Sequence, residues 1–148
     1  MLISVRDLLR LKGDAVWCVA PGTSMIDALH ELADKDIGAL LVMEGGSIAG
    51  IISERDVVRK IVETGMFEPG GTVSEYMTPG VFTIGPTQTI EDCMNLMTEK
   101  RIRHLPVVEA DKLVGMISIG DVVKAIITSQ EFTIDQLTKF IDGGGYNQ

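Results

Sequence analysis

Two short motifs place an aspartate three residues after a serine, each directly behind an apolar segment. They are Ser53 to Asp56 and Ser118 to Asp121. An ionised carboxylate offers acceptors on two oxygens, which suits the two hydroxyls of a ribose. The preceding serine can bond a ribose or phosphate oxygen, and a helix N-terminus close by favours an anion. These residue types therefore suit a nucleotide site.

The same spacing also describes a helix cap. In that interpretation Ser53 caps the helix and Asp56 returns a bond to the backbone of the serine. Spacing alone favours capping, and the second occurrence at Ser118 and Asp121 does not decide the matter, because a duplicated fold needs duplicated caps. Capping and binding can coexist.

Both motifs belong to a tandem duplication. The sequence IAGIISERDVV at 48–58 returns as LVGMISIGDVV at 113–123, and a shift of 65 residues lays one on the other without a gap. The register holds outward, matching Pro21 to Pro86, with about a third of the paired positions identical. Units of this size bury too little surface to be stable alone, so the two copies are expected to pack around a shared core.

Periodicity predicts the same order of elements in each copy: strand, helix, strand, strand, helix. Helix caps are expected at Ser24 and Thr89, and a helix stop at Gly65. A further short helix is expected between Ser4 and Gly13, and an amphipathic one beyond Ser129. The predicted divisions are a first repeat with its N-terminal helix at 1–64, a linker at 65–72, a second repeat at 73–128, and a C-terminal helix with tail at 129–148.

Composition narrows the class of protein. Hydrophobic residues make up 45% of the chain and aromatic residues 5%, and the net charge of −8 argues against a nucleic-acid partner. No apolar run is long enough to span a membrane and no signal peptide is evident, so a cytoplasmic location is expected. Cys18 and Cys93 have no metal-ligand spacing and are expected to be buried, with no metal site.

The repeat order and several motifs resemble paired cystathionine-β-synthase domains, the CBS pair or Bateman module. The resemblance rests on the glycine of the third strand (Gly50, Gly115), on the two serine–aspartate motifs, and on RHLPVV at 103–108. It covers residues from about 1 to 128, and is greatest to small stand-alone CBS-pair proteins of bacteria and plant organelles. That subgroup also tends to end in a helix followed by glycines and an aromatic, as 143–146 do here. The fold class is thus expected to be α/β (α+β), with two βαββα repeats packed as a pseudo-twofold pair and an extra C-terminal helix.

The resemblance implies ligand clefts between the repeats, because in CBS pairs the motif of one repeat faces the first two strands of the other. The primary nucleotide cleft is expected to combine Asp56 with the cations of the second repeat; its candidate residues are Ile51, Ser53, Arg55, Asp56, Ser74, Met77, Ile102, Arg103 and His104. A secondary cleft, which is weaker, empty or takes a ligand without a phosphate there, is expected at Ile37, Gly38, Ala39, Met116, Ser118 and Asp121. Trp17 and Phe82 could stack on a base, but buried filling is the favoured interpretation.

Taken together, the resemblance implies a regulatory, signal-transducing homodimer that binds AMP, ADP, ATP or NAD, requires no cofactor and acts on an unidentified protein. The alternative is a ligand-independent dimerisation scaffold for a partner protein. An enzyme is the weakest hypothesis, since His30 and His104 occupy non-equivalent repeat positions and no phosphate loop or nucleophile motif is present.

Overall fold

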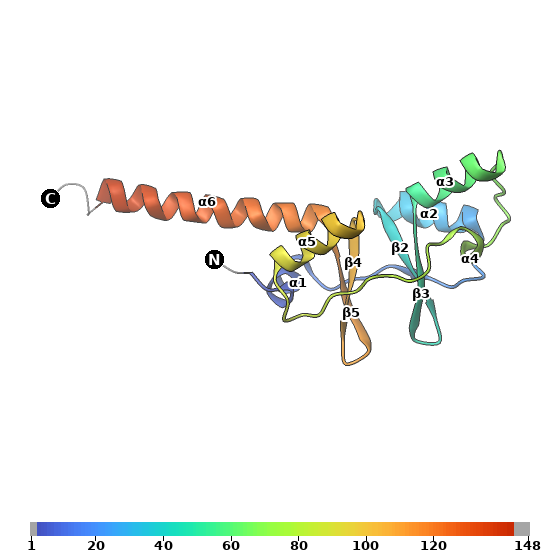
Figure 1. The fold of residues 1–148 in the computed structure, drawn as a ribbon, viewed down its shortest axis with the longest axis horizontal. Helices are drawn as coiled ribbons and strands as arrows, with labels where there is room; N and C mark the ends of the chain where they lie inside the picture. The colour runs from blue at the N-terminus through green and yellow to red at the C-terminus, as the bar shows by residue number, and fades with distance from the viewer. Residues whose placement is uncertain (1–2, 144–148) are drawn as a thin grey trace. The chain divides into compact units, whose positions relative to one another are not determined.

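The protein forms two compact units in a computed structural model that describes residues 3–143 (Figure 1). One unit covers Ala15–Thr83, and the other combines the chain up to Asp14 with the chain from Ile84 onward. The first is called the Asp56 unit below and the second the Asp121 unit. The glycines and the tyrosine predicted at 144–146 lie outside the described residues.

The Asp56 unit is built on a three-stranded sheet in the order β1-β2-β3, which carries three helices. Strands β2 (Ala39–Glu44) and β3 (Ser47–Ser53) form the predicted hairpin, and β1 (Cys18–Val19) runs parallel to β2. The hairpin turn places Gly45 and Gly46 at positive φ, a conformation that glycine adopts without steric cost. Helices α2 (Met25–Lys35), α3 (Glu54–Thr64) and α4 (Val73–Tyr76) complete the unit.

The Asp121 unit repeats this plan with one strand fewer. Strands β4 (His104–Glu109) and β5 (Lys112–Ser118) form a hairpin with α5 (Ile90–Lys100), and the predicted first strand shrinks to a single bridge between Ile84 and Val107. Pro106 explains the loss, because its counterpart Leu41 donates its N–H to the Trp17 carbonyl at 3.1 Å and proline has no N–H to donate.

The segment that precedes each repeat in the sequence packs on the other repeat. Helix α1 (Val5–Lys12) joins the second repeat, where the N–H of Val5 donates to the Gln88 carbonyl at 2.7 Å. Helix α4 makes the matching bond in the first repeat, from the N–H of Val73 to the Thr23 carbonyl at 2.8 Å. The N-terminal helix predicted to belong to repeat 1 is therefore part of the unit that contains repeat 2.

A glycine in the last strand of each sheet permits this packing. A Cβ on Gly50 would lie 2.6 Å from the Met77 sulfur and 2.9 Å from the Thr78 carbonyl oxygen. A Cβ on Gly115 would lie 2.7 Å from a methyl carbon of Leu9. Both glycines are thus required for close approach, and the preceding segment occupies the space that a side chain would fill.

The last helix is longer than predicted. Helix α6 (Ile119–Gly143) runs without interruption through Ser129, so the repeat helix and the predicted C-terminal helix are one element. Neither glycine nor proline occurs between 121 and 142 to end it. Its C-terminal part extends beyond the rest of the Asp121 unit (Figure 1).

Three predictions of buried side chains are wrong. Trp17 and Phe82 are 43% and 44% exposed, and Cys18 is exposed on the short edge strand β1. Lys35 covers one face of Trp17, with Nζ 4.4 Å from the ring centroid. Cys93 is buried as predicted, and burial together with the Asp92 charge raises its pKa to about 11.

Substituting alanine at the two strand glycines tests the close packing. Gly50→Ala should lower the free energy of unfolding by about 1–3 kcal/mol, because the Cβ meets a backbone oxygen that has little freedom to move. Gly115→Ala should cost less, since only the end of the Leu9 side chain must shift. Urea unfolding would measure both, with Gly22→Ala as the control because a Cβ there meets nothing within 4 Å. Equal costs at Gly50 and Gly22 would contradict the packing.

Candidate functional site

The carboxylate of Asp56 is buried and has hydrogen-bond donors on both oxygens. Its Oδ2 accepts from the Ser53 N–H at 2.8 Å and from the Ser53 hydroxyl at 2.9 Å. Its Oδ1 accepts from the Thr78 hydroxyl at 2.5 Å. Thr78 is held there by two backbone hydrogen bonds with Ile51 of β3, at 2.9 and 3.0 Å. The capping role of Asp56 is confirmed. The remaining oxygen accepts from a neutral side chain, Thr78, in the segment that precedes the second repeat.

The carboxylate of Asp121 is only partly buried, and its hydrogen bonds within the described residues all fall on Oδ2. That oxygen accepts from the Ser118 N–H at 2.9 Å and from the Lys12 ammonium at 2.6 Å. The Asp121 N–H donates to the Ser118 hydroxyl at 3.2 Å, so the second motif also caps its helix. The pKa of Asp121 is lowered: burial acts to raise it, and the hydrogen bonds and charge of Lys12 and the bond from Ser118 outweigh that effect.

The strand register adds two more basic side chains to the Asp121 unit. His104 is the first residue of β4 and pairs with Ser118 across the sheet, while Arg103, one residue earlier, is exposed. Burial lowers the pKa of His104, the Asp121 carboxylate acts to raise it, and the charges of Lys12 and Arg103 act to lower it further. The equivalent first residue of β2 is Ala39, opposite Ser53. At the strand position opposite the motif serine, the Asp121 unit therefore has a histidine where the Asp56 unit has an alanine.

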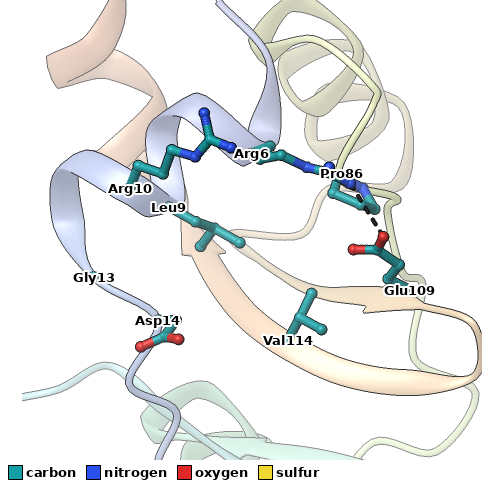
Figure 2. Close-up of a pocket in the computed structure, with 8 residues that line it drawn as sticks. All are labelled: Arg6, Leu9, Arg10, Gly13, Asp14, Pro86, Glu109 and Val114. Carbon is teal, nitrogen blue, oxygen red and sulfur yellow. Dashed lines mark hydrogen bonds and ion pairs between the residues drawn. The ribbon is translucent and has the colours of Figure 1, made fainter.

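Several contacts fix helix α1, which carries Lys12. The Ser4 hydroxyl accepts from the Asp7 N–H at 3.1 Å to cap the helix, and Arg6 forms an ion pair with Glu109 at 3.2 Å (Figure 2). Leu9 points toward β5 beside Val114 (Figure 2). Both side chains line a pocket of about 360 Å³, and Arg6 and Glu109 also belong to its lining. None of the residues predicted for a nucleotide site lines this pocket, so we interpret these contacts as an anchor for α1.

The predicted site residues divide between the two units. Around the first motif, the structure brings together Ser53, Asp56, Ile51 and Met77, and Met77 packs on the neighbouring Gly50. Ser74 is on α4, where its hydroxyl is 2.9 Å from that of Thr72, and Arg55 is exposed on α3. Both clefts as predicted draw on each unit; the Asp56 unit contains Ile37, Gly38, Ala39, Ile51, Ser53, Arg55, Asp56, Ser74 and Met77, and the Asp121 unit contains Ile102, Arg103, His104, Met116, Ser118 and Asp121. Their association into clefts stays a prediction.

Sequence reasoning missed Lys12 and Thr78, the two residues that reach the aspartates from the preceding segments. A signal was available, because Ser4 and Val5 match Thr72 and Val73 at a shift three residues longer than that of the repeat body. In that register Leu9 matches Met77, and these are the two side chains that lie on the strand glycines. The alignment with one fixed shift concealed this correspondence.

The described residues contain neither a candidate metal-binding group nor a helix that could cross a membrane. Within residues 3–143, no group of three or more histidine, cysteine, aspartate or glutamate side chains is placed to hold a metal ion. No helix in the same range has both the length and the apolar character to cross a membrane.

A duplicated arrangement of a hairpin with flanking helices, with a strand glycine and a serine–aspartate cap in each copy, defines a class of paired repeat domains. The family model described as "CBS domain" matches residues 5–63 and 73–128, and the chain belongs to this family. A CBS domain-containing mitochondrial protein of Arabidopsis thaliana, CBSX3, is 34% identical over 95% of this chain and 73% of its own length.

Solved structures show the same fold. A CBS-domain containing protein from Agrobacterium tumefaciens is 41% identical, with a TM-score of 0.79 over 82% of this chain and 92% of its own. The structure of CBSX2 in complex with AMP is 30% identical, with a TM-score of 0.69 over 86% of this chain and 98% of its own. These relatives are named for their CBS domains rather than for a reaction.

The charges around His104 give a titration test. His104 should titrate below its ordinary pKa of about 6.5, because burial favours the neutral ring. Asp121→Asn should lower the pKa further by removing the charge that opposes burial, whereas Lys12→Met should raise it. Two-dimensional NMR of the imidazole signals measures the pKa of His104 in all three proteins. Shifts of the same sign in the two variants would contradict the arrangement.

The same depressed pKa predicts how stability depends on pH. A histidine whose pKa is lower in the folded state contributes stability that is present above its unfolded pKa and is lost as the pH falls through the folded value. Between pH 7 and pH 5 the wild-type protein should therefore lose more stability than a His104→Gln variant, and denaturant midpoints at several pH values would measure the difference.

Proposed function

We propose that this CBS pair is a regulatory module that binds adenosine-containing ligands at its serine–aspartate motifs, with no chemical step. The observation that carries the proposal is the carboxylate at the start of a helix in each unit, held by the backbone of the preceding serine. A partly buried carboxylate in this position can accept both hydroxyls of a ribose. The AMP complex of CBSX2 supports the ligand class.

The contacts within each unit support an order of the two sites that differs from the sequence-based ranking. Both oxygens of Asp56 are engaged by Ser53 and Thr78, and the side chain is buried. Asp121 is more accessible, and Lys12, Arg103 and His104 belong to its unit. We therefore propose that a phosphate-bearing ligand such as AMP, ADP, ATP or NAD binds first at Asp121. The pairing of Arg103 and His104 with Asp56 stays a prediction.

A thermal-shift comparison tests function and order together. AMP at one hundred times its dissociation constant should stabilise the protein by about 2.7 kcal/mol, because it binds only the folded state. Asp121→Ala should remove most of this ligand-induced shift, and Asp56→Ala should remove less, although it lowers the melting temperature of the free protein more. The comparison uses the shift caused by ligand, so the intrinsic cost of each substitution cancels.

The matched control is Asp92→Ala, which removes the capping aspartate of α5 and belongs to neither serine–aspartate motif. It should lower the melting temperature and leave the AMP-induced shift intact. A panel of AMP, ATP, NAD and S-adenosylmethionine that gives no shift in the wild-type protein would sink the proposal of an adenosine sensor.

Self-association is the second proposed property, and α6 is the observation that favours it. Exposed apolar side chains recur on this helix at alternating steps of four and three residues, with one glutamine in the series: Val123, Ile127, Gln130, Ile134, Leu137 and Ile141. This heptad spacing is typical of a helix that pairs with a second helix, and a single polar position fixes the register of such a pair. We propose that α6 pairs with α6 of a second copy, in a homodimer that could also present the module to a regulated protein.

Breaking the apolar series tests the dimer. Ile134→Glu combined with Leu137→Glu should convert the protein to a monomer in analytical ultracentrifugation at micromolar concentration, because the two charges would be buried in the paired seam. The control is Phe132→Glu, which alters an exposed apolar residue outside the series. A dimer that survives the double substitution would place the interface elsewhere.

We propose a cytoplasmic location, in agreement with two free cysteines among the described residues. The name of CBSX3 places that relative in mitochondria, so similarity to it does not favour the cytoplasm.

A further inference from the structure

Lys12 forms an ion pair with the aspartate of the second serine–aspartate motif. Its ammonium donates to Asp121 Oδ2 at 2.6 Å and to the Met116 carbonyl oxygen at 2.7 Å. The side chains of Lys12 and Asp121 are 28% and 23% exposed, so the pair is neither buried nor fully solvated. The ammonium therefore occupies the oxygen that already serves the cap, at the end of β5.

The helix that carries Lys12 is fixed, but the lysine side chain need not be. Val5 and Leu8 are buried, and the Arg6–Glu109 pair ties the far side of α1 to the β4–β5 hairpin. Lysine has a flexible four-carbon stem and a compact charge that can exchange one partner for another. Motion of Lys12 away from Asp121 thus requires only side-chain rotation, with α1 in place.

The first repeat shows what is specific about this contact. In the Asp56 unit, the segment before the second repeat places the neutral hydroxyl of Thr78 on the Asp56 carboxylate. A ligand that binds Asp56 therefore displaces no charged group from it. At Asp121, a ribose that takes both carboxylate oxygens displaces an ammonium. The displaced charge then stays beside Arg103 and the partly buried His104 without an anionic partner, unless the ligand brings one.

We propose that Lys12 is a partner-switching residue that makes the Asp121 site select anionic over neutral adenosine ligands. This inference rests on the proposed function of that site. In the free protein Lys12 pairs with Asp121 and competes with the ribose hydroxyls. When AMP binds, the ammonium exchanges the carboxylate for the phosphate, whereas adenosine leaves it unpaired. The site thereby distinguishes two ligands with the same base and sugar.

The experiment compares the dissociation constants of AMP and adenosine by isothermal titration calorimetry on the full chain. Wild-type protein should bind AMP more tightly than adenosine. Lys12→Met should bind adenosine more tightly than wild type does and AMP less tightly, so that the preference falls at least tenfold, equivalent to about 1.4 kcal/mol. Lys12→Arg keeps the positive charge and should retain most of the preference.

Two controls assign the effect to the Lys12–Asp121 pair. Lys112→Met removes the same charge from the exposed first residue of β5 in the same unit and should leave the preference unchanged. In an Asp121→Asn background, Lys12→Met should no longer improve adenosine binding, because no carboxylate remains for lysine to occupy. Circular dichroism melts of every variant establish that each is folded before titration.

The possible results separate the inference from the function on which it rests. If AMP binds wild type and Lys12→Met with an unchanged preference over adenosine, partner switching is overturned and the adenosine site stands. An equal loss in Lys112→Met would show a general charge effect and would also overturn it. If neither ligand binds wild type or Lys12→Met, the proposed function fails and the selectivity of Lys12 fails with it.

Discussion

The close approach of a chain segment to a strand glycine determines most of what this protein presents at its two motifs. Leu9 lies on Gly115 and Met77 lies on Gly50, in each case where any side chain would collide. This packing brings the residues that follow to the end of the strand, where the serine–aspartate cap begins. Lys12 meets Asp121 and Thr78 meets Asp56 for this reason. The same packing contact, present once in each unit, thus delivers two chemically different side chains.

The exchange of preceding segments also explains how half-size repeats become stable units. Each sheet has only two or three strands, and one face needs apolar cover from outside the repeat. Val5 and Leu8 provide that cover in one core, and Val73 and Tyr76 provide it in the other. The Asp56 unit takes its cover from the segment that follows the first repeat, so its core lies within the continuous stretch Ala15–Thr83. The Asp121 unit takes its cover from the N-terminal segment, so its core combines two separate stretches of the chain.

Sequence patterns predicted the hairpins, the helix caps at Ser24 and Thr89, and the family, because these depend on local periodicity and on recurring residues. They did not predict the segment exchange, which depends on packing between residues far apart in the chain. The sequence signal for the loss of the first strand in the second repeat is Pro106, which lacks an N–H. Its effect can be predicted only when the strand that would pair with it is known. At the candidate site, the two aspartates were evident from their spacing, whereas the role of the segment that carries Lys12 was hidden by a three-residue change of register.

Helix α6 begins one residue after Ser118 and continues for 25 residues to Gly143. At 1.5 Å per residue this makes a rod of roughly 37 Å, whose first turn contains Asp121. A rod held at one end works as a lever, so a tilt of about 10° at the first turn moves its far end by roughly 6 Å. A small rotation of the first turn of α6 around Asp121 would thus move the C-terminal end of the helix by a distance comparable to the length of a side chain.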